Sequence, residues 1–406
     1  MSWLRKTPGS SSVNTQTGEM DPILAAAAIA LIGFGIVMVY SASAIEATVR
    51  FHDPEYFLKR QAAFGLVGLV LLWLVSRIDY QRLRKLTYPV LGSVTILLVM
   101  TAVGMGVRRG GAVRWLAVGP IMVQPAEMAK LALVLWLAYS LAKKAEKVKS
   151  FTIGFVPHVL MSGLLILFCL KQPDFGSAVV IAFLTFTLLF VAGARISYLL
   201  GGAVALTAIG AQLIKMSSYR VDRLVAFLDI DRHRQDIAYQ PFQSVMSFGS
   251  GGISGLGLGR GLQVLYLPEA HNDFIAAIVG EELGFVGIIG LAGVFLLVVA
   301  RGVRAAFRAR DDFGAYLAFG IAAMLGIQAL VNMAVAMAIL PTKGLTLPFI
   351  SYGGSSLLVN ATAVGVLLNI SRPRIDVAEA AESTPLEERL PNVSEAVISS
   401  AEEGSA

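Results

Sequence analysis

Charged residues and cysteine are both scarce in this chain. Only 15% of its 406 residues are charged and 56% are hydrophobic, whereas an average soluble domain carries about 25% charged residues. This composition excludes an ordinary soluble protein, and we expect no nucleic-acid partner. The single cysteine, Cys169, lies in an apolar run. The chain can therefore form no internal disulfide and no cysteine-rich metal site.

Long apolar runs are what the chain has instead. A helix needs about 20 apolar residues to cross the hydrocarbon core of a bilayer. Ten runs of Ala, Val, Leu, Ile, Phe and Gly are candidate spans: 22–43, 61–78, 87–107, 125–142, 154–171, 177–193, 196–214, 274–299, 314–339 and 348–370. The sequence therefore predicts an all-α polytopic membrane protein with about ten transmembrane helices.

The basic residues are distributed unequally between the two ends of these spans. The termini and the loops on their side carry 17 Lys and Arg residues, and the short loops on the other side carry 8. Because basic residues favour the cytoplasmic side, both termini are predicted to be cytoplasmic. Residues 215–273 then form one long extracytoplasmic loop, which does not count in this rule. Residues 1–19 lack the apolar stretch of a cleavable signal, so the first span is expected to act as the membrane signal.

Three regions follow from these patterns. Residues 1–20 are polar and rich in Ser and Thr, and they predict a disordered cytoplasmic segment. Residues 21–374 form the membrane domain. Residues 375–406 contain many acidic residues and no apolar periodicity, which predicts a disordered cytoplasmic tail.

Polar residues at the predicted outer face are candidates for chemistry. Glu127 and Lys130 lie three residues apart, on one face of a helix, and can pair at the membrane edge. They can be a structural ion pair, or a site wall in which Lys130 offers a cation to an anionic ligand. Asp174, in Gln-Pro-Asp-Phe-Gly, is expected as an isolated acid to cap the next helix. That reading weakens because Lys130 needs more than one possible partner.

The end of the long loop combines glycines with a polar cluster. The glycines between 251 and 261 allow a close backbone approach to a ligand or a flat course along the membrane. His271, Asn272 and Asp273 precede the eighth span, and Glu281 and Glu282 follow two turns later. Asp273 can be a plain helix cap. However, one cap does not require five polar residues.

The last outer loop, 340–356, contains two prolines, three glycines and a single charge, Lys343. Irregular backbone at membrane depth is tolerated where it lines a cavity or is buried in protein, so a water-filled pocket is expected. Cations and carboxylates thus gather at one surface: Arg60, Arg114, Lys130, Lys343, Glu127, Asp174 and Asp273. This mixture suits a ligand with a diphosphate and a nearby hydroxyl, because cations stabilise a departing phosphate while a carboxylate removes a proton.

Ordered motifs in these loops resemble the SEDS family (shape, elongation, division and sporulation) of peptidoglycan polymerases. The resemblance covers about residues 21–374, and its final loop is similar to the FtsW-like cell-division branch. The motifs are Arg60-Gln61, Gly-Ala-Val-Arg114-Trp115, Gln124-Pro-Ala-Glu127-Met-Ala-Lys130, Gln172-Pro-Asp174-Phe-Gly176, Tyr239-Gln240, Pro268-Glu-Ala-His271-Asn-Asp273-Phe274 and Lys343-Gly-Leu-Thr-Leu-Pro-Phe-Ile-Ser-Tyr-Gly-Gly-Ser-Ser.

The resemblance implies an inverting glycosyltransferase that polymerises lipid II in the cytoplasmic (inner) membrane at the division septum. Asp273 is then the general base. Lys130 and Asp174 match a charge pair of the family, and Arg60 and Arg114 match its cavity arginines. The implied partners are a class B penicillin-binding transpeptidase and other division proteins. No metal ligands are identified, and help from Mg²⁺ or Mn²⁺ to the leaving diphosphate stays open.

The chain departs from the family pattern in the long loop. Ala238 stands before Tyr239-Gln240 where relatives often have Gly, and Gly261 and Val264 stand where relatives commonly carry Ser and Lys. A cationic contact from that Lys would have to come from Arg260 instead.

Two other functions are compatible with the same residues. Charges inside a membrane are as typical of transport pathways as of catalysis, so a lipid II flippase is one alternative. We would expect a transport path to reach the cytoplasmic face, whereas these polar residues cluster on the outer side. A non-catalytic scaffold that recruits division proteins is the other alternative.

Overall fold

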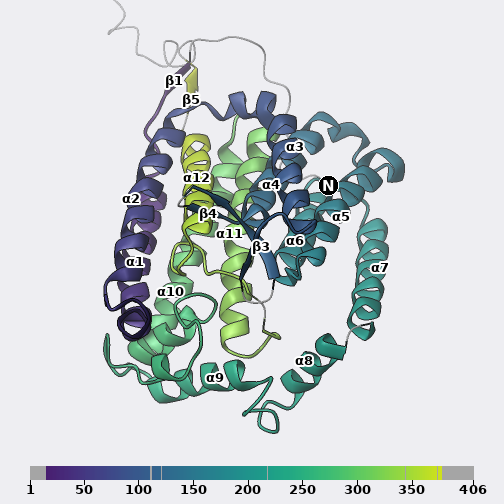
Figure 1. Cartoon of the computed structure of the whole chain (residues 1–406). Coiled ribbons are helices and arrows are strands. Elements are labelled where there is room, and N and C mark those ends of the chain that lie inside the picture. Colours follow the sequence, from purple (N-terminus) through teal and green to yellow (C-terminus); the bar gives the residue numbers. More distant parts are fainter. Residues whose placement is uncertain are drawn as a thin grey trace, which may run out of the picture.

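The chain is described here from a computed structural model, which covers residues 15–109, 112–119, 121–216, 218–342, 344–372 and 374–376. Long helices run side by side through most of its length (Figure 1). Within the described residues, eight of them are long and apolar enough to cross a membrane, and two further apolar helices, Phe175–Val191 and Ile196–Lys215, accompany them.

Each of the ten predicted spans corresponds to a helix. Their bounds are α1 Pro22–Phe51, α2 Tyr56–Arg77, α3 Leu83–Ala102, α4 Pro125–Lys143, α5 Val156–Lys171, α6 Phe175–Val191, α7 Ile196–Lys215, α10 Ile275–Arg308, α11 Asp312–Ala336 and α12 Gly354–Ser371. The prediction of a polytopic helical membrane protein is thereby confirmed. Single turns of tighter or wider helix occupy Tyr80–Arg82, Ala145–Lys147, Phe151–Phe155 and Gln263–Leu265.

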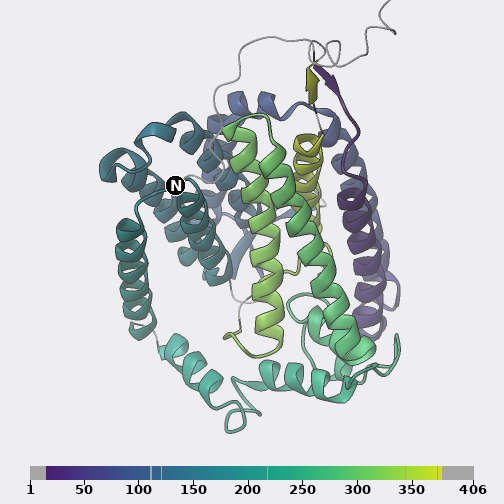
Figure 2. The same cartoon turned by 180° about the vertical axis from the view of Figure 1, so that it is seen from behind.

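The predicted long loop contains two further helices, α8 Ser218–Leu228 and α9 Tyr239–Gly251. They lie across the end of the bundle and connect α7 to α10, as the front and back views both show (Figures 1 and 2). α9 packs against α10 and α11. Residues 215–273 are therefore a helical cover over one end of the bundle.

A small sheet replaces the end of the third predicted span. α3 stops at Ala102, and an antiparallel three-stranded sheet follows, formed by β2 Val107–Arg109, β3 Ala112–Val118 and β4 Ile121–Val123. The prediction of helix up to residue 107 was too long, because β-branched and aromatic residues of this segment pair as strands. This sheet places Arg114 on β3.

The two ends of the membrane domain meet. β1 Thr15–Thr17 pairs antiparallel with β5 Arg374–Asp376 at the end of the bundle opposite α8 and α9 (Figure 1). The prediction that both ends lie on the same side is confirmed. Residues 1–14 and 377–406 lie outside the described residues, so a disordered N-terminal segment and acidic tail stay predictions.

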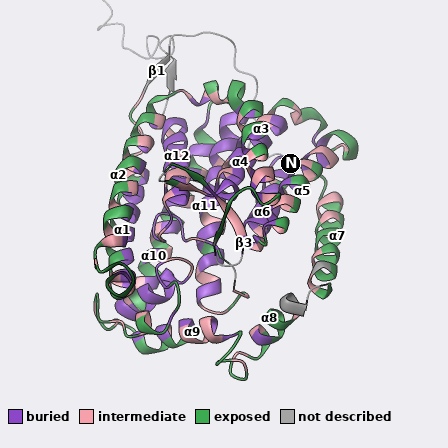
Figure 3. Cartoon of the chain, viewed as in Figure 1, coloured by how far each residue is buried: buried purple, intermediate pink, exposed green. Residues whose placement is uncertain are grey.

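The core runs along α4, α11 and α12. About two thirds or more of the most apolar 18-residue window of each helix is buried, against 28% for α10, and Figure 3 shows the same concentration. Because lipid surrounds the bundle, the exposed apolar side chains of outer helices such as α7 face hydrocarbon. Polar side chains buried along α4, α11 and α12 therefore need partners within the protein.

α10 is broken at Gly284, whose φ of 66° and ψ of −163° are not helical. The glycine-rich segment fills the break: the N–H of Gly257 donates to the carbonyl of Glu282 at 2.9 Å, and the N–H of Phe285 donates to the carbonyl of Gly252 at 2.9 Å. Only glycine tolerates this backbone conformation without strain. The glycines thus allow backbone to approach backbone, where we had predicted approach to a ligand or the membrane.

Candidate functional site

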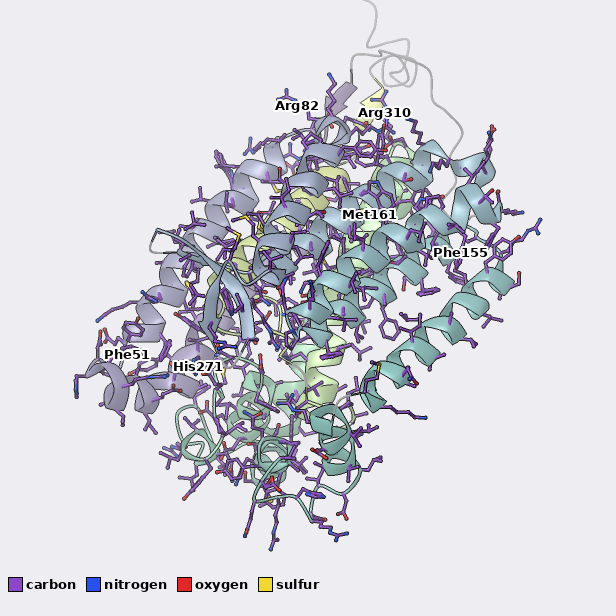
Figure 4. All side chains as sticks on the ribbon, turned by 45° about the vertical axis from the view of Figure 1, so that its right-hand side comes forward. Phe51, Arg82, Phe155, Met161, His271 and Arg310 are labelled. Carbon is purple, nitrogen blue, oxygen red and sulfur yellow. The ribbon has the colours of Figure 1, made fainter. Side chains whose placement is uncertain are left out.

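The candidate site lies at the end of the bundle where four loops meet. They precede α4, α6 and α10 and follow α11. Figure 4 places His271 of the α10 loop far from Arg82 and Arg310, two of the basic residues predicted to be cytoplasmic. The predicted separation of the polar loops from the cytoplasmic basic residues is present in the fold.

Asp273 is half-buried beside Arg114. It is not the cap of α10, because that helix begins after Phe274 and no side chain caps it. A Cβ placed on Gly344 would lie 3.2 Å from Asp273 Oδ2 and 3.5 Å from Arg114 Nη1. The carboxylate and the guanidinium therefore face the same small space above Gly344. No described residue donates a hydrogen bond to this carboxylate.

The surroundings of Asp273 favour its protonated form. Burial raises the pKa of the Asp273 carboxyl to about 7, and the negative charges of Glu269 and, more weakly, Asp174 act in the same direction. Arg114 opposes them by favouring the carboxylate. A pKa near 7 suits a general base, because such a group is ionised in part and still accepts a proton readily.

Arg114 is oriented by backbone carbonyls of the loop before α6. Its Nε donates to the carbonyl of Gln172 at 3.0 Å, and its Nη2 donates to the carbonyl of Pro173. The side chain of Gln172 in turn donates to the carbonyl of Leu98 at 2.9 Å. Two of the three guanidinium nitrogens are thus held by the protein, and Nη1 is the one that faces Asp273.

Asp174 caps α6. Its carboxylate accepts hydrogen bonds from the Ser177 N–H at 3.0 Å, the Ser177 hydroxyl at 2.9 Å and the Gln124 side chain at 3.3 Å. The capping role that an isolated Asp predicts is therefore confirmed. The buried carboxylate is saturated with donors, and it contributes negative charge near Asp273.

Lys130 and Glu127 are buried inside the bundle and paired. Lys130 Nζ lies 2.7 Å from Glu127 Oε1 and donates to Gln328 Oε1 at 2.5 Å. The second oxygen of Glu127 accepts the Ser356 hydroxyl at 3.2 Å. Among the described residues, the ion pair of Lys130 is with Glu127, which differs from the pairing with Asp174 that the resemblance implied. The two residues link α4 to α11 and α12.

His271 forms part of the wall. Its ring packs against those of Phe57 and Tyr352, with centroids 4.5 Å and 5.6 Å away, and those two rings also contact each other. Its Nδ1 is 3.5 Å from Glu46 Oε2 on α1. Glu46 was missed by the sequence reasoning, although a carboxylate near the end of an apolar span was a visible signal. This packing fixes the chain two residues before Asp273.

Two other predicted site residues are not joined to Asp273 by a described contact. Arg60 is exposed on α2, and its guanidinium lies 4.9 Å from the ring centroid of Tyr56. Lys343 lies outside the described residues, next to Gly344. Within the described ranges, no group of three or more His, Cys, Asp and Glu side chains is arranged to hold a metal ion.

Glu281 and Glu282 bind other parts of the chain than the candidate site. Glu281 accepts hydrogen bonds from the N–H groups of Leu262 and Gln263, at 2.8 and 3.0 Å. Glu282 accepts one from the Ser41 hydroxyl at 2.5 Å. Glu281 thus holds the end of the glycine-rich segment against α10, and Glu282 links α10 to α1. No described contact joins either carboxylate to Asp273, with which the sequence grouped them.

Comparisons with known proteins give one consistent result. The family model described as "Cell cycle protein", which covers FtsW, RodA and SpoVE, matches residues 22–375. A protein named probable peptidoglycan glycosyltransferase FtsW, from Trichlorobacter lovleyi, is 46% identical over 355 residues, covering 87% of this chain and 93% of its own.

Solved structures give the same fold. One, described as a peptidoglycan synthase complex that coordinates polymerization and crosslinking, superposes with a TM-score of 0.73 at 31% identity, covering 87% of this chain and 97% of its own. The rod shape determining protein RodA of Thermus thermophilus superposes with a TM-score of 0.63 at 30% identity, over 87% of this chain and 96% of its own.

Proposed function

The chain belongs to the family of cell cycle proteins that includes FtsW, RodA and SpoVE, and from this premise we propose that it is a peptidoglycan glycosyltransferase that polymerises lipid II during septal wall synthesis. The single observation that carries the proposal is the geometry at Asp273. A half-buried carboxylate without a hydrogen-bond donor among the described residues faces the same space as Arg114 Nη1. A base and a cation meet there, as glycosyl transfer to a hydroxyl requires.

The proposed step is one inverting displacement. The 4-hydroxyl oxygen of the acceptor GlcNAc attacks the anomeric carbon of the donor as its proton passes to Asp273. A new glycosidic bond forms, the bond from that carbon to the diphosphate oxygen breaks, and undecaprenyl diphosphate leaves with the electron pair. The proton leaves Asp273 for solvent before the next cycle.

Cations have the complementary role. The developing charge on the diphosphate is stabilised by Arg114, whose Nε and Nη2 are held by backbone carbonyls and whose Nη1 faces the site. Arg60 and Lys343 are proposed to add positive charge at the rim, and His271 and Asp174 to shape the wall. Buried Lys130 and Glu127 lie deeper, and we assign them to holding α4, α11 and α12 beneath the substrate.

The multi-pass fold sets where this chemistry occurs. We propose that the protein lies in the cytoplasmic membrane at the division septum with its paired ends inside, as the basic residues of the loops predict. The site then opens on the outer face, where lipid-linked sugars would be joined.

A cross-linking partner is part of the proposal. A solved structure with 31% identity to this chain belongs to a complex described as coordinating polymerization and crosslinking. We propose that this chain likewise works with a class B penicillin-binding transpeptidase, which cross-links the new strand.

Purified protein supplied with lipid II tests the activity directly. We expect glycan chains resolved on a gel, with or without the transpeptidase. A matched assay in vesicles with fluorescent lipid II measures movement between leaflets. Lipid movement without polymer would indicate a flippase. Neither movement nor polymer, with or without the partner, would leave a scaffold as the function and contradict the proposal.

A further inference from the structure

We propose that Asn332 on α11 is a positioning residue for the proposed reaction: its carboxamide fixes the backbone of Asp273 to the loop that follows α11. This inference rests on the proposed function and adds a residue to it. Asn332 is buried, with 1% of its surface exposed. No described contact of Asn332 reaches the space between Asp273 and Arg114, so Asn332 acts through its effect on the position of Asp273.

The geometry is that of a clamp. Asn332 Nδ2 donates to the backbone carbonyl of Asp273 at 3.0 Å and to that of Leu345 at 2.6 Å. Both protons of one amide group are therefore used, one on each loop. Leu345 follows Gly344, the residue above which the Asp273 carboxylate and Arg114 lie. The two hydrogen bonds of Asn332 thus set the distance between Asp273 and Gly344.

A second hydrogen bond joins the same two loops. The N–H of Tyr352 donates to the carbonyl of His271 at 2.9 Å. The segment from His271 to Asp273 is therefore tied at both ends to the segment 345–352, at one end by backbone and at the other by the side chain of Asn332. Only the second tie is open to change by substitution of a side chain.

The burial of Asn332 supports this role. Its Oδ1 atom has no hydrogen-bond partner among the described residues and is not accessible to solvent. A buried polar atom without a partner is costly, and an apolar residue at this position of an apolar helix would avoid that cost. Rotating the amide would place the oxygen against two carbonyl oxygens, so the assigned orientation is the favourable one.

Loss of the clamp has a defined kinetic consequence. A displacement of about 1 Å at a reacting group can cost about a hundredfold in rate. The diphosphate contacts of Arg114 do not depend on Asn332, so substrate binding should change little. Water would also reach the Asp273 carboxylate more easily, which removes part of the burial that favours its protonated form. The pH at which activity rises should therefore move downward.

Asn332→Leu tests the proposal against the matched variant Asn369→Leu. Asn369 on α12 is also buried and also bridges backbone groups, accepting from the N–H of Tyr80 at 3.0 Å and donating to the carbonyl of Ser76 at 3.0 Å. It lies near the opposite end of the bundle. With lipid II, we expect Asn332→Leu to lower kcat about 10- to 100-fold, with KM within about threefold, and Asn369→Leu to keep wild-type kcat and pH profile.

The pH profile separates positioning from loss of fold. Partial unfolding lowers the rate at every pH equally, whereas positioning moves the inflection to lower pH. If Asn332→Leu does not fold, Asn332→Ala removes both donors without adding bulk or charge, and the same two readouts apply. Wild-type rate and profile in the folded Asn332 variant overturn this inference alone. A wild-type protein that makes no glycan overturns the proposed function, and this inference with it.

Discussion

At the scale of single residues, the site depends on a carboxylate, that of Asp273, which does not cap a helix. Asp174 lies directly before α6 and caps it, whereas Asp273 lies two residues before the start of α10 and does not cap that helix. The sequence allowed a cap at either position and argued against one at Asp273 from its polar neighbours, and the structural difference is a shift of one residue in the start of α10. Hydrogen-bond donors occupy the Asp174 carboxylate, whereas no described residue donates to the carboxylate of Asp273.

The first prediction concerns pH. Because the pKa of Asp273 is raised to about 7, the base is mostly protonated at pH 6 and mostly ionised at pH 8. Rates of glycan formation should therefore rise about tenfold from pH 5.5 to pH 6.5 and level off above about pH 7.5. The measurement is the initial rate from lipid II at concentrations well below KM, because this rate reports the pKa of the free enzyme. A rate that is flat from pH 5.5 to pH 8 contradicts this assignment.

Two other residues of the site, Asn332 and Glu46, could not be identified from the sequence, because their roles depend on contacts between distant segments. Arg114 and Asp273 stood out because charges are rare in this chain and gather at this surface. Asn332 reads as one more polar residue in an apolar helix, and its significance depends on two carbonyl oxygens, one in the loop that precedes α10 and one in the loop that follows α11. Glu46 likewise acquires its partner, His271, only when α1 packs beside the α10 loop.

At the scale of elements, hydropathy predicted the helices well and their interruptions poorly. All ten spans exist because a bilayer admits few alternatives to apolar helices. The sheet after α3 was missed, since three short strands give little periodicity. The break in α10 was also missed, because it depends on a distant glycine-rich segment that supplies the hydrogen bonds the helix loses.

The second prediction concerns this break. In Gly284→Ala, the new Cβ would lie 2.4 Å from the backbone nitrogen of Gly255, at a φ that L residues rarely adopt. We expect the free energy of unfolding to fall by about 2 kcal/mol or more. Gly290→Ala in the same helix is the control, because its Cβ meets nothing within 4 Å, and it should be neutral or stabilising. Thermal unfolding in detergent compares them, and equal midpoints would contradict the account of the break.

The third prediction concerns the buried ion pair of α4. Lys130→Met leaves Glu127 charged and buried without its cation. This should lower the free energy of unfolding by about 3–5 kcal/mol. Lys130→Met combined with Glu127→Met removes both charges and should restore most of the stability. Thermal unfolding in detergent is again the measurement. If the double variant is as unstable as the single one, the pair is not the reason that Lys130 is needed for folding.

At the scale of the whole molecule, the fold brings loops from four places in the chain to one end of a bundle whose own ends meet at the other (Figure 1). The number of helices and the side on which the polar loops gather followed from composition and charge. The way those loops interlock did not, because the contacts join residues far apart in the sequence. The activity we propose depends on that interlocking.

The central claim is that Asp273 accepts the proton during glycan synthesis, and one comparison tests it most directly. Lipid II polymerisation at pH 8 is measured for wild-type protein, Asp273→Asn and Asp231→Asn, which removes an exposed carboxylate from the same long loop. We predict that Asp273→Asn is folded but at least about a hundredfold slower, while Asp231→Asn matches wild type. A folded Asp273→Asn protein that forms glycan chains at near wild-type rate would contradict the account.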